Sequence, residues 1–188
     1  MRKILATAAL ATLALGAVAV PASAGGINGS GTLICGGTGS TKTKPGLGSG
    51  GGTLASTTSV KATLTSCSGT GDGATVASGS AKGGSSSATN GCGDLAGPGT
   101  TNMSITVKWK GSAKLNPTTV NFATLTGDAS GATLAFTLSG GSVSGSFAGS
   151  TPVSVGTTTM DVATYLAGCG SKKGVTGFTL SSIAASFS

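Results

Sequence analysis

The sequence has no histidine and no glutamate, and its four acidic residues are all aspartates. After residue 24 it also has no arginine and no glutamine. Histidine and glutamate are the side chains that most often act as general acid or base, so the chain lacks the usual groups for proton transfer. Neither of two common nucleophile spacings, Gly-x-Ser-x-Gly and Ser-x-x-Lys, occurs after residue 24. We therefore predict that the protein is not an enzyme.

Aromatic residues are also scarce. There is one tryptophan, one tyrosine and five phenylalanines, too few to supply a platform on which sugar rings or bases stack. Lysine is the only basic residue after residue 24, and it meets a phosphate as a point charge, without the two-pronged geometry of arginine. These absences disfavour stacking and bidentate phosphate recognition.

The chain is rich in small and hydroxylated residues, with 34 Gly, 26 Ser and 28 Thr among the 164 residues after Ala24. Because these residues are weak helix formers, a helical bundle is excluded. A disordered chain would combine few large apolar residues with a high net charge. Here nine Lys and four Asp give a net charge of only +5 after residue 24, and the apolar residues alternate with polar ones. We expect a folded domain with a sparse core.

The first 24 residues have the three parts of a signal peptide. Arg2 and Lys3 are basic, residues 4–20 are mainly apolar, and residues 22–24 form an A-x-A cleavage site. The apolar run is slightly shorter than the roughly 20 residues of a transmembrane helix, and no later stretch is apolar enough to span a membrane as a helix. We predict cleavage of residues 1–24 and a single domain over residues 25–188. That domain would be secreted, or associated with the cell wall.

The four cysteines, Cys35, Cys67, Cys92 and Cys169, are an even set in an exported chain, which favours two disulfides. A zinc site would need close cysteine pairs or a histidine, whereas the gaps are 32, 25 and 77 residues. Three pairings are open. We prefer Cys35–Cys67, which would join two early strands, together with Cys92–Cys169, which would tie the middle of the chain to its end.

Alternation of apolar and polar residues predicts an all-β fold. The clearest case is 101–110, where four apolar side chains from Met103 to Trp109 face one way. The Gly140-Gly141 pair indicates a tight hairpin, and a change of phase at Ser181-Ser182 indicates a bulge. We expect an antiparallel β-sandwich or small barrel of about eight or nine short strands. The expected strands cover 30–35, 42–47, 57–66, 74–90 (a weak strand or pair of strands), 101–110, 118–126, 132–138, 141–147 and 175–187.

One segment has helical periodicity. Residues 158–168 place small and apolar side chains on one stripe, with Thr158 or Thr159 as the N-cap and Gly168 as the C-cap. The stretch from Asp161 to Tyr165 also resembles the segment before the second cysteine of immunoglobulin variable domains. In those domains the cysteine follows the tyrosine by two residues, and here it follows by four. We therefore predict one short helix near 158–168.

Two patterns that can mark a cofactor or metal carry little weight here. Residues 46–51 match G-x-G-x-x-G, but no helix and no suitably placed acidic residue follows them. The aspartates are widely spaced and mostly adjacent to glycine, as turn residues are. We expect neither a cofactor nor a metal site. The aspartates are Asp72, Asp94, Asp128 and Asp161.

Five lysines are placed so that several share a strand face. Lys42 and Lys44 are two residues apart, as are Lys108 and Lys110, and Lys61 points away from the apolar side of its own strand. A grouped lysine face could hold an anionic polymer such as a wall polyphosphate, an acidic glycan or a nucleic acid. The alternative is that outward lysines keep a sheet soluble and protect its edges from pairing.

The layout resembles small secreted proteins of unknown function from high-GC Gram-positive bacteria (actinobacteria). The resemblance rests on the signal peptide and on four short motifs at residues 31–35, 64–69, 107–110 and 167–169. It implies export and an all-β fold, and it names no site. We predict a secreted, disulfide-stapled, non-catalytic protein with a structural or binding role at the cell surface. A lysine-mediated binder of anionic cell-envelope polymers is the alternative.

Overall fold

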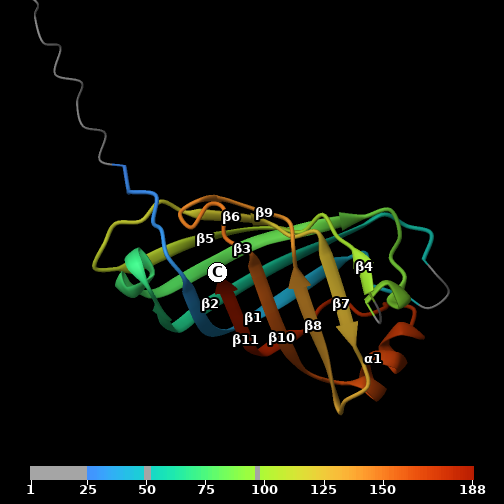
Figure 1. Ribbon diagram of the computed structural model, residues 1–188. Helices are drawn as coiled ribbons and strands as arrows, with labels where there is room; N and C mark the ends of the chain where they lie inside the picture. The colour runs from blue at the N-terminus through green and yellow to red at the C-terminus, as the bar shows by residue number, and fades with distance from the viewer. Residues whose placement is uncertain (1–24, 49–51, 96–97) are drawn as a thin grey trace, which may run out of the picture.

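A computed structural model describes residues 25–48, 52–95 and 98–188, so the predicted signal peptide lies outside the described residues. Over these ranges the protein is nearly all β: eleven strands form one antiparallel sheet that curls into a half-barrel, with one short α-helix (Figure 1). The predicted all-β antiparallel class is confirmed. The prediction of eight or nine strands in a β-sandwich is wrong, because eleven strands form one curled sheet. No helix of the described residues is long and apolar enough to cross a membrane.

The strands follow one another in the sheet in the order β4-β7-β8-β10-β11-β1-β2-β3-β5-β6-β9. The predicted bulge at Ser181-Ser182 is confirmed, because the register of β11 shifts there against β1 and against β10. The strand bounds are β1 Leu33–Lys44, β2 Ser56–Gly69, β3 Val76–Ser87, β4 Pro98–Thr100, β5 Ser104–Gly111, β6 Thr118–Asn121, β7 Thr124–Asp128, β8 Thr133–Ser139, β9 Ser142–Gly145, β10 Pro152–Asp161 and β11 Thr179–Phe187. The helices are the 3-10 turns η1 (Gly71–Thr75) and η2 (Cys92–Leu95) and the α-helix α1 (Val162–Cys169).

The glycines within β1 and β3 do not interrupt these strands. β1 runs unbroken through three glycines, so the two strands expected at 30–35 and 42–47 are parts of one strand. β3 is likewise a single strand where 74–90 gave only a weak signal. A Cβ at Gly79 would press against the ring of Trp109, which lies opposite it on β5. Glycine at this position lets a large ring pack on the sheet, and it does not end the strand.

Two bent strands carry the chain from one end of the strand order to the other. β6 is next to last in that order and β7 is second, yet only Phe122 and Ala123 separate them. β8 and β9 are related in the same way, because β8 pairs with β7 and β10 whereas β9 pairs with β6. The Gly140-Gly141 pair, with φ values of 67° and 93°, therefore bends a strand. The tight hairpin predicted there is wrong. The Ala123 N–H donates to the Ser139 carbonyl at 3.3 Å, which continues the pairing through the bend.

The helix is displaced from its predicted position near 158–168. The first four residues of that segment belong to β10, and α1 covers Val162–Cys169. Residues 153–159 are rich in valine and threonine, whose branched side chains favour an extended backbone. The N-cap is Asp161 rather than a threonine, and its carboxylate accepts a 2.7 Å hydrogen bond from the Thr164 backbone N–H.

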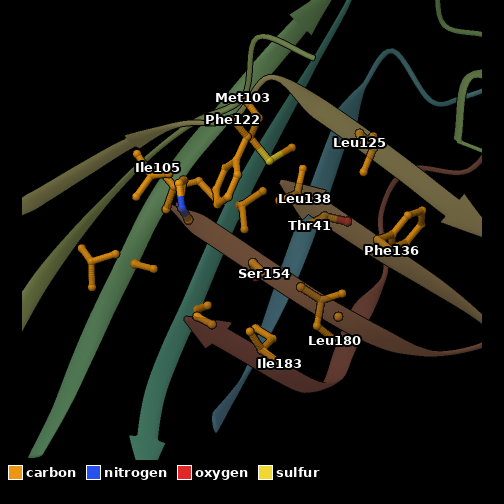
Figure 2. Close-up of a pocket in the computed structure, with 18 of the residues that line it drawn as sticks. Thr41, Met103, Ile105, Phe122, Leu125, Phe136, Leu138, Ser154, Leu180 and Ile183 are labelled. Atoms are coloured by element: carbon orange, nitrogen blue, oxygen red, sulfur yellow. The ribbon is translucent and has the colours of Figure 1, made fainter. Parts of the chain in front are cut away.

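Apolar side chains fill the concave side of the sheet in two clusters. In the larger cluster the half-buried Trp109 packs edge-on against Phe147 and Phe187, with ring centroids 5.8 Å apart in both pairs. The smaller cluster includes the α1 residue Tyr165 and the stacked rings of Phe136 and Phe178. Members of both clusters line a cavity on this side of the sheet (Figure 2).

Candidate functional site

Six exposed lysines share the outer face of four neighbouring strands, β1, β2, β3 and β5. Alternation along each strand places them there, because the residues directly before them (Thr41, Thr43, Val60, Ala81, Val107 and Trp109) belong to the inward set of their strands. On β2, for example, Val60 and Ala62 line the interior cavity and Lys61 between them is exposed. We refer to this group as the lysine face: Lys42, Lys44, Lys61, Lys82, Lys108 and Lys110.

The strand register brings four of these lysines into one row. Lys61 and Lys82 are direct cross-strand partners on β2 and β3. Lys42 pairs with the residue two positions before Lys61, and Lys108 pairs with the residue two positions before Lys82. Neighbouring strands lie about 4.8 Å apart, and the two offsets of two residues add roughly 13 Å along the strands, so the row is diagonal and spans roughly 20 Å. The face therefore concentrates positive charge over a short distance.

No described carboxylate forms an ion pair with the lysine face. Asp72 lies in η1 and Asp128 ends β7. Asp161, which caps α1, lines the same surface pocket as Lys42 but forms no ion pair with it. Within residues 25–48, 52–95 and 98–188, none of the six lysines forms an ion pair. The side chains between the lysines include the hydroxyls of Ser40, Thr63, Ser80 and Thr106.

The structure thus places all five lysines singled out from the sequence on one face and adds a sixth. Lys82 was missed because its strand, expected within 74–90, is interrupted by glycine and serine. A signal was nevertheless present. The pair Ala81-Lys82 has an inward apolar residue followed by an outward lysine, which is the same pattern as Val60-Lys61.

The three aspartates whose side chains are described bind nearby backbone N–H groups and do not gather into a site; the Asp94 side chain lies outside the described residues. Asp72 accepts a 2.8 Å hydrogen bond from the backbone N–H of Ser30. The Ser130 hydroxyl, and then its backbone N–H, lower the pKa of Asp128. The backbone N–H of Thr164, and then its hydroxyl, lower the pKa of Asp161. Among the described residues, no three acidic or cysteine side chains come together as metal ligands.

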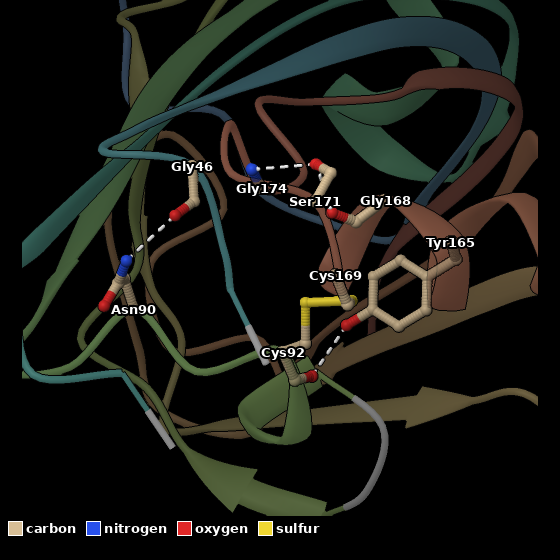
Figure 3. The surroundings of a disulfide bond; sticks show 8 residues. All are labelled: Gly46, Asn90, Cys92, Tyr165, Gly168, Cys169, Ser171 and Gly174. Carbon is tan, nitrogen blue, oxygen red and sulfur yellow. Dashed lines mark hydrogen bonds between the residues drawn. A yellow bond between two sulfur atoms is a disulfide. The ribbon is translucent and has the colours of Figure 1, made fainter. Parts of the chain in front are cut away.

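Both predicted disulfides are confirmed. Cys35–Cys67 joins β1 to β2 within the sheet. Cys92–Cys169 ties η2 to the last residue of α1 (Figure 3). Beside it the buried Tyr165 hydroxyl donates a 2.6 Å hydrogen bond to the Cys92 carbonyl. This corner of the molecule is a structural anchor that fixes α1 against the sheet.

Comparison with known proteins gives no match: no protein-family model, no curated protein and no solved structure matches the chain. The resemblance to secreted actinobacterial proteins therefore stays a prediction. Any function must be argued from the residues themselves, and on the described surface the lysine face is the feature that points to one.

Proposed function

We propose that the protein is an extracellular, non-catalytic binding protein that holds an anionic polymer of the cell envelope on its lysine face. The observation that carries the proposal is the direct pairing of Lys61 with Lys82, flanked on the adjacent strands by Lys42 and Lys108. Like charges placed opposite one another destabilise a sheet. Lysines needed only for solubility would be better interspersed with acidic residues. A polyanion lying along the row relieves the repulsion.

The chemistry of the face favours a polymer with regularly spaced charges. Lysine attracts phosphate or carboxylate without arginine's fixed geometry, and the hydroxyls between the lysines can donate to the same oxygens. All seven aromatic side chains are buried or half-buried, so the outer face has no ring on which bases or sugars could stack. A wall polyphosphate or an acidic glycan therefore fits better than a nucleic acid.

The extracellular part of the proposal is supported by the two disulfides. Such bonds form and persist in oxidising compartments and are rare in the cytosol. The two disulfides stabilise the fold of a chain whose core contains few large side chains. Stability of this kind suits a protein that works at a cell surface or in the cell wall.

Retention on immobilised polyphosphate tests the proposal. The variant K61Q/K82Q removes the two charges at the centre of the row and keeps a polar side chain, one atom shorter, at both positions. The control K172Q/K173Q removes the same charge from two exposed lysines in the turn after α1. We expect K61Q/K82Q to elute at lower salt, with the slope of log affinity against log salt reduced by about 1.5–2.

The control variant is expected to elute close to the unmodified protein. Equal losses in the two double variants would show that net charge alone causes retention, and the lysine face would then have no specific role. Repeating the elution on a carboxylated glycan tells phosphate from carboxylate as the preferred anion.

A further inference from the structure

The concave side of the sheet holds a partly open cavity of about 140 Å³ that the lysine face does not use (Figure 2). Its walls come from strands in both halves of the strand order. Met103 and Phe122 lie on one side of it, and Leu180 and Ile183 lie on another. None of the residues that line the cavity carries a charge. The cavity is therefore suited to an uncharged, mainly apolar occupant.

Three threonines on β1 and β2 bring hydroxyl groups into the apolar wall. The Oγ1 atoms of Thr43 and Thr58 are 3.0 Å apart, and Thr43 is only 2% exposed. One of the two hydroxyl protons makes that bond, and the described residues offer the other no acceptor. The Thr41 hydroxyl accepts a 3.1 Å hydrogen bond from the Phe178 N–H, so its own proton is also unused. All three threonines line the cavity, so its wall includes hydroxyl protons that no described acceptor takes.

We propose that this cavity binds a small uncharged molecule with a hydrocarbon body and one carbonyl or ether oxygen, which accepts a hydrogen bond from the Thr43/Thr58 pair. The volume sets the size: a cavity of about 150 Å³ accommodates benzene, so the occupant has roughly six to eight non-hydrogen atoms. The apolar walls exclude a charged occupant, because burying an unpaired charge is strongly unfavourable. The unused donors select a molecule with an acceptor oxygen.

Two probes of the same shape test the proposal on the full chain with both disulfides formed. Cyclohexanone carries a carbonyl oxygen, and methylenecyclohexane has a CH₂ group in its place. Methyl NMR of the methionines reports binding, because Met103 lines the cavity and Met160 does not. We expect saturable shifts of the Met103 methyl with both probes and no shift at Met160. No shift of Met103 with either probe would mean that the cavity is only a packing defect, and the proposal would fail.

The hydroxyl assignment is tested by T43V/T58V, which removes both oxygens and keeps the side-chain shape. We expect it to weaken cyclohexanone binding about five- to tenfold and to leave methylenecyclohexane binding unchanged. The control T57V/T63V makes the same change at exposed positions of β2 and should alter neither affinity. Equal effects of T43V/T58V on both probes would overturn the hydroxyl assignment.

Filling the cavity gives a second, independent test. Ala81 is 6% exposed and lines the cavity, so A81L would place three additional carbon atoms inside it. We expect the folded variant, identified by the near-ultraviolet circular dichroism of Trp109, to bind neither probe. Unchanged binding by folded A81L would place the probes elsewhere and overturn the proposal. Should A81L not fold, the T43V/T58V comparison still decides the outcome.

Discussion

The hydroxyl of Tyr165 donates a 2.6 Å hydrogen bond to the backbone carbonyl of Cys92, although 73 residues separate the two in sequence. Cys92 is also bonded to Cys169, four positions after Tyr165. A helix of eight residues is too short to be stable alone. α1 is therefore held by tertiary anchors, among them a disulfide and a buried hydrogen bond, more than by its own helical tendency.

Replacing Tyr165 by Phe tests the hydrogen-bonded anchor. The ring would still fill its site, but the Cys92 carbonyl would lose its donor. We expect the free energy of unfolding to fall by about 1–3 kcal/mol, measured by guanidinium denaturation with the disulfides intact. The control Thr124→Val removes an exposed hydrogen bond to the Ser139 carbonyl and should cost less than roughly 0.5 kcal/mol. Equal losses would contradict a special role for the buried bond.

Removing each disulfide by paired alanine substitution should distinguish the contributions of the two disulfides to stability and to the ordering of α1. Cys92–Cys169 closes a separation of 77 residues and Cys35–Cys67 one of 32. By chain entropy alone the losses are roughly 4.5 and 3.7 kcal/mol. Only the loss of Cys92–Cys169 should speed amide hydrogen exchange throughout α1, since Cys35–Cys67 joins strands that also pair along their backbones. Faster α1 exchange in the C35A/C67A variant instead would contradict this assignment.

Local sequence pattern was a good guide to single strands and a poor guide to their partners. The alternation from Met103 to Trp109 predicted the inward side of β5, and Met103 and Val107 are buried as expected. The Gly140-Gly141 pair shows the limit. Two residues with positive φ serve a reversal or a bend equally well, and which occurs depends on the strands that pair with β8 and β9. β9 pairs with β6 and not with the adjacent β8, and nothing in the residues around the glycine pair specifies that choice.

The same limit applies to the sites. A period of two places Lys61 and Lys108 on the outer side of their own strands, but only the pairing of β2 with β3 and of β3 with β5 makes them part of one row. The opposition of Lys61 and Lys82 depends on register, which a shift of one residue would destroy. The cavity was beyond sequence reasoning, because its lining runs from Thr41 to Phe187 and exists only when the sheet curls.

Thr118 links the only tryptophan to the backbone. The Trp109 indole N–H donates to the Thr118 hydroxyl at 2.7 Å, and that hydroxyl donates to the Ser146 carbonyl at 2.9 Å. Thr118→Val keeps the shape of this fully buried side chain and leaves both partners unpaired. We expect a loss of about 2–4 kcal/mol in the free energy of unfolding and a shift in Trp109 fluorescence. Thr119→Val, on the outer side of the same strand, is the control and should leave the emission unchanged.

The N-cap of α1 predicts a dependence of stability on pH. Hydrogen bonds from the Thr164 N–H, and then from its hydroxyl, lower the pKa of Asp161 in the folded state. Its contribution is therefore complete above the ordinary aspartate pKa of about 4 and is lost as the pH falls through the folded value. Asp161→Asn keeps a capping oxygen but does not titrate. We expect its melting temperature to fall less than that of the unmodified protein between pH 5 and pH 2; identical profiles would contradict the prediction.

Reversing the charge of Lys82 should stabilise the protein and weaken its binding to polyphosphate. Lys82→Glu would place a carboxylate directly opposite Lys61 and turn a repulsive pair into an attractive one. We expect the free energy of unfolding to rise by roughly 0.2–1 kcal/mol at low salt, and the gain to shrink as salt screens these exposed charges. Retention on polyphosphate should fall at the same time. Lys173→Glu makes the same charge change outside the sheet and should neither raise stability nor lower retention to the same extent.

A less stable Lys82→Glu variant would mean that Lys61 and Lys82 do not repel each other, and the main support for a polyanion on this face would be lost.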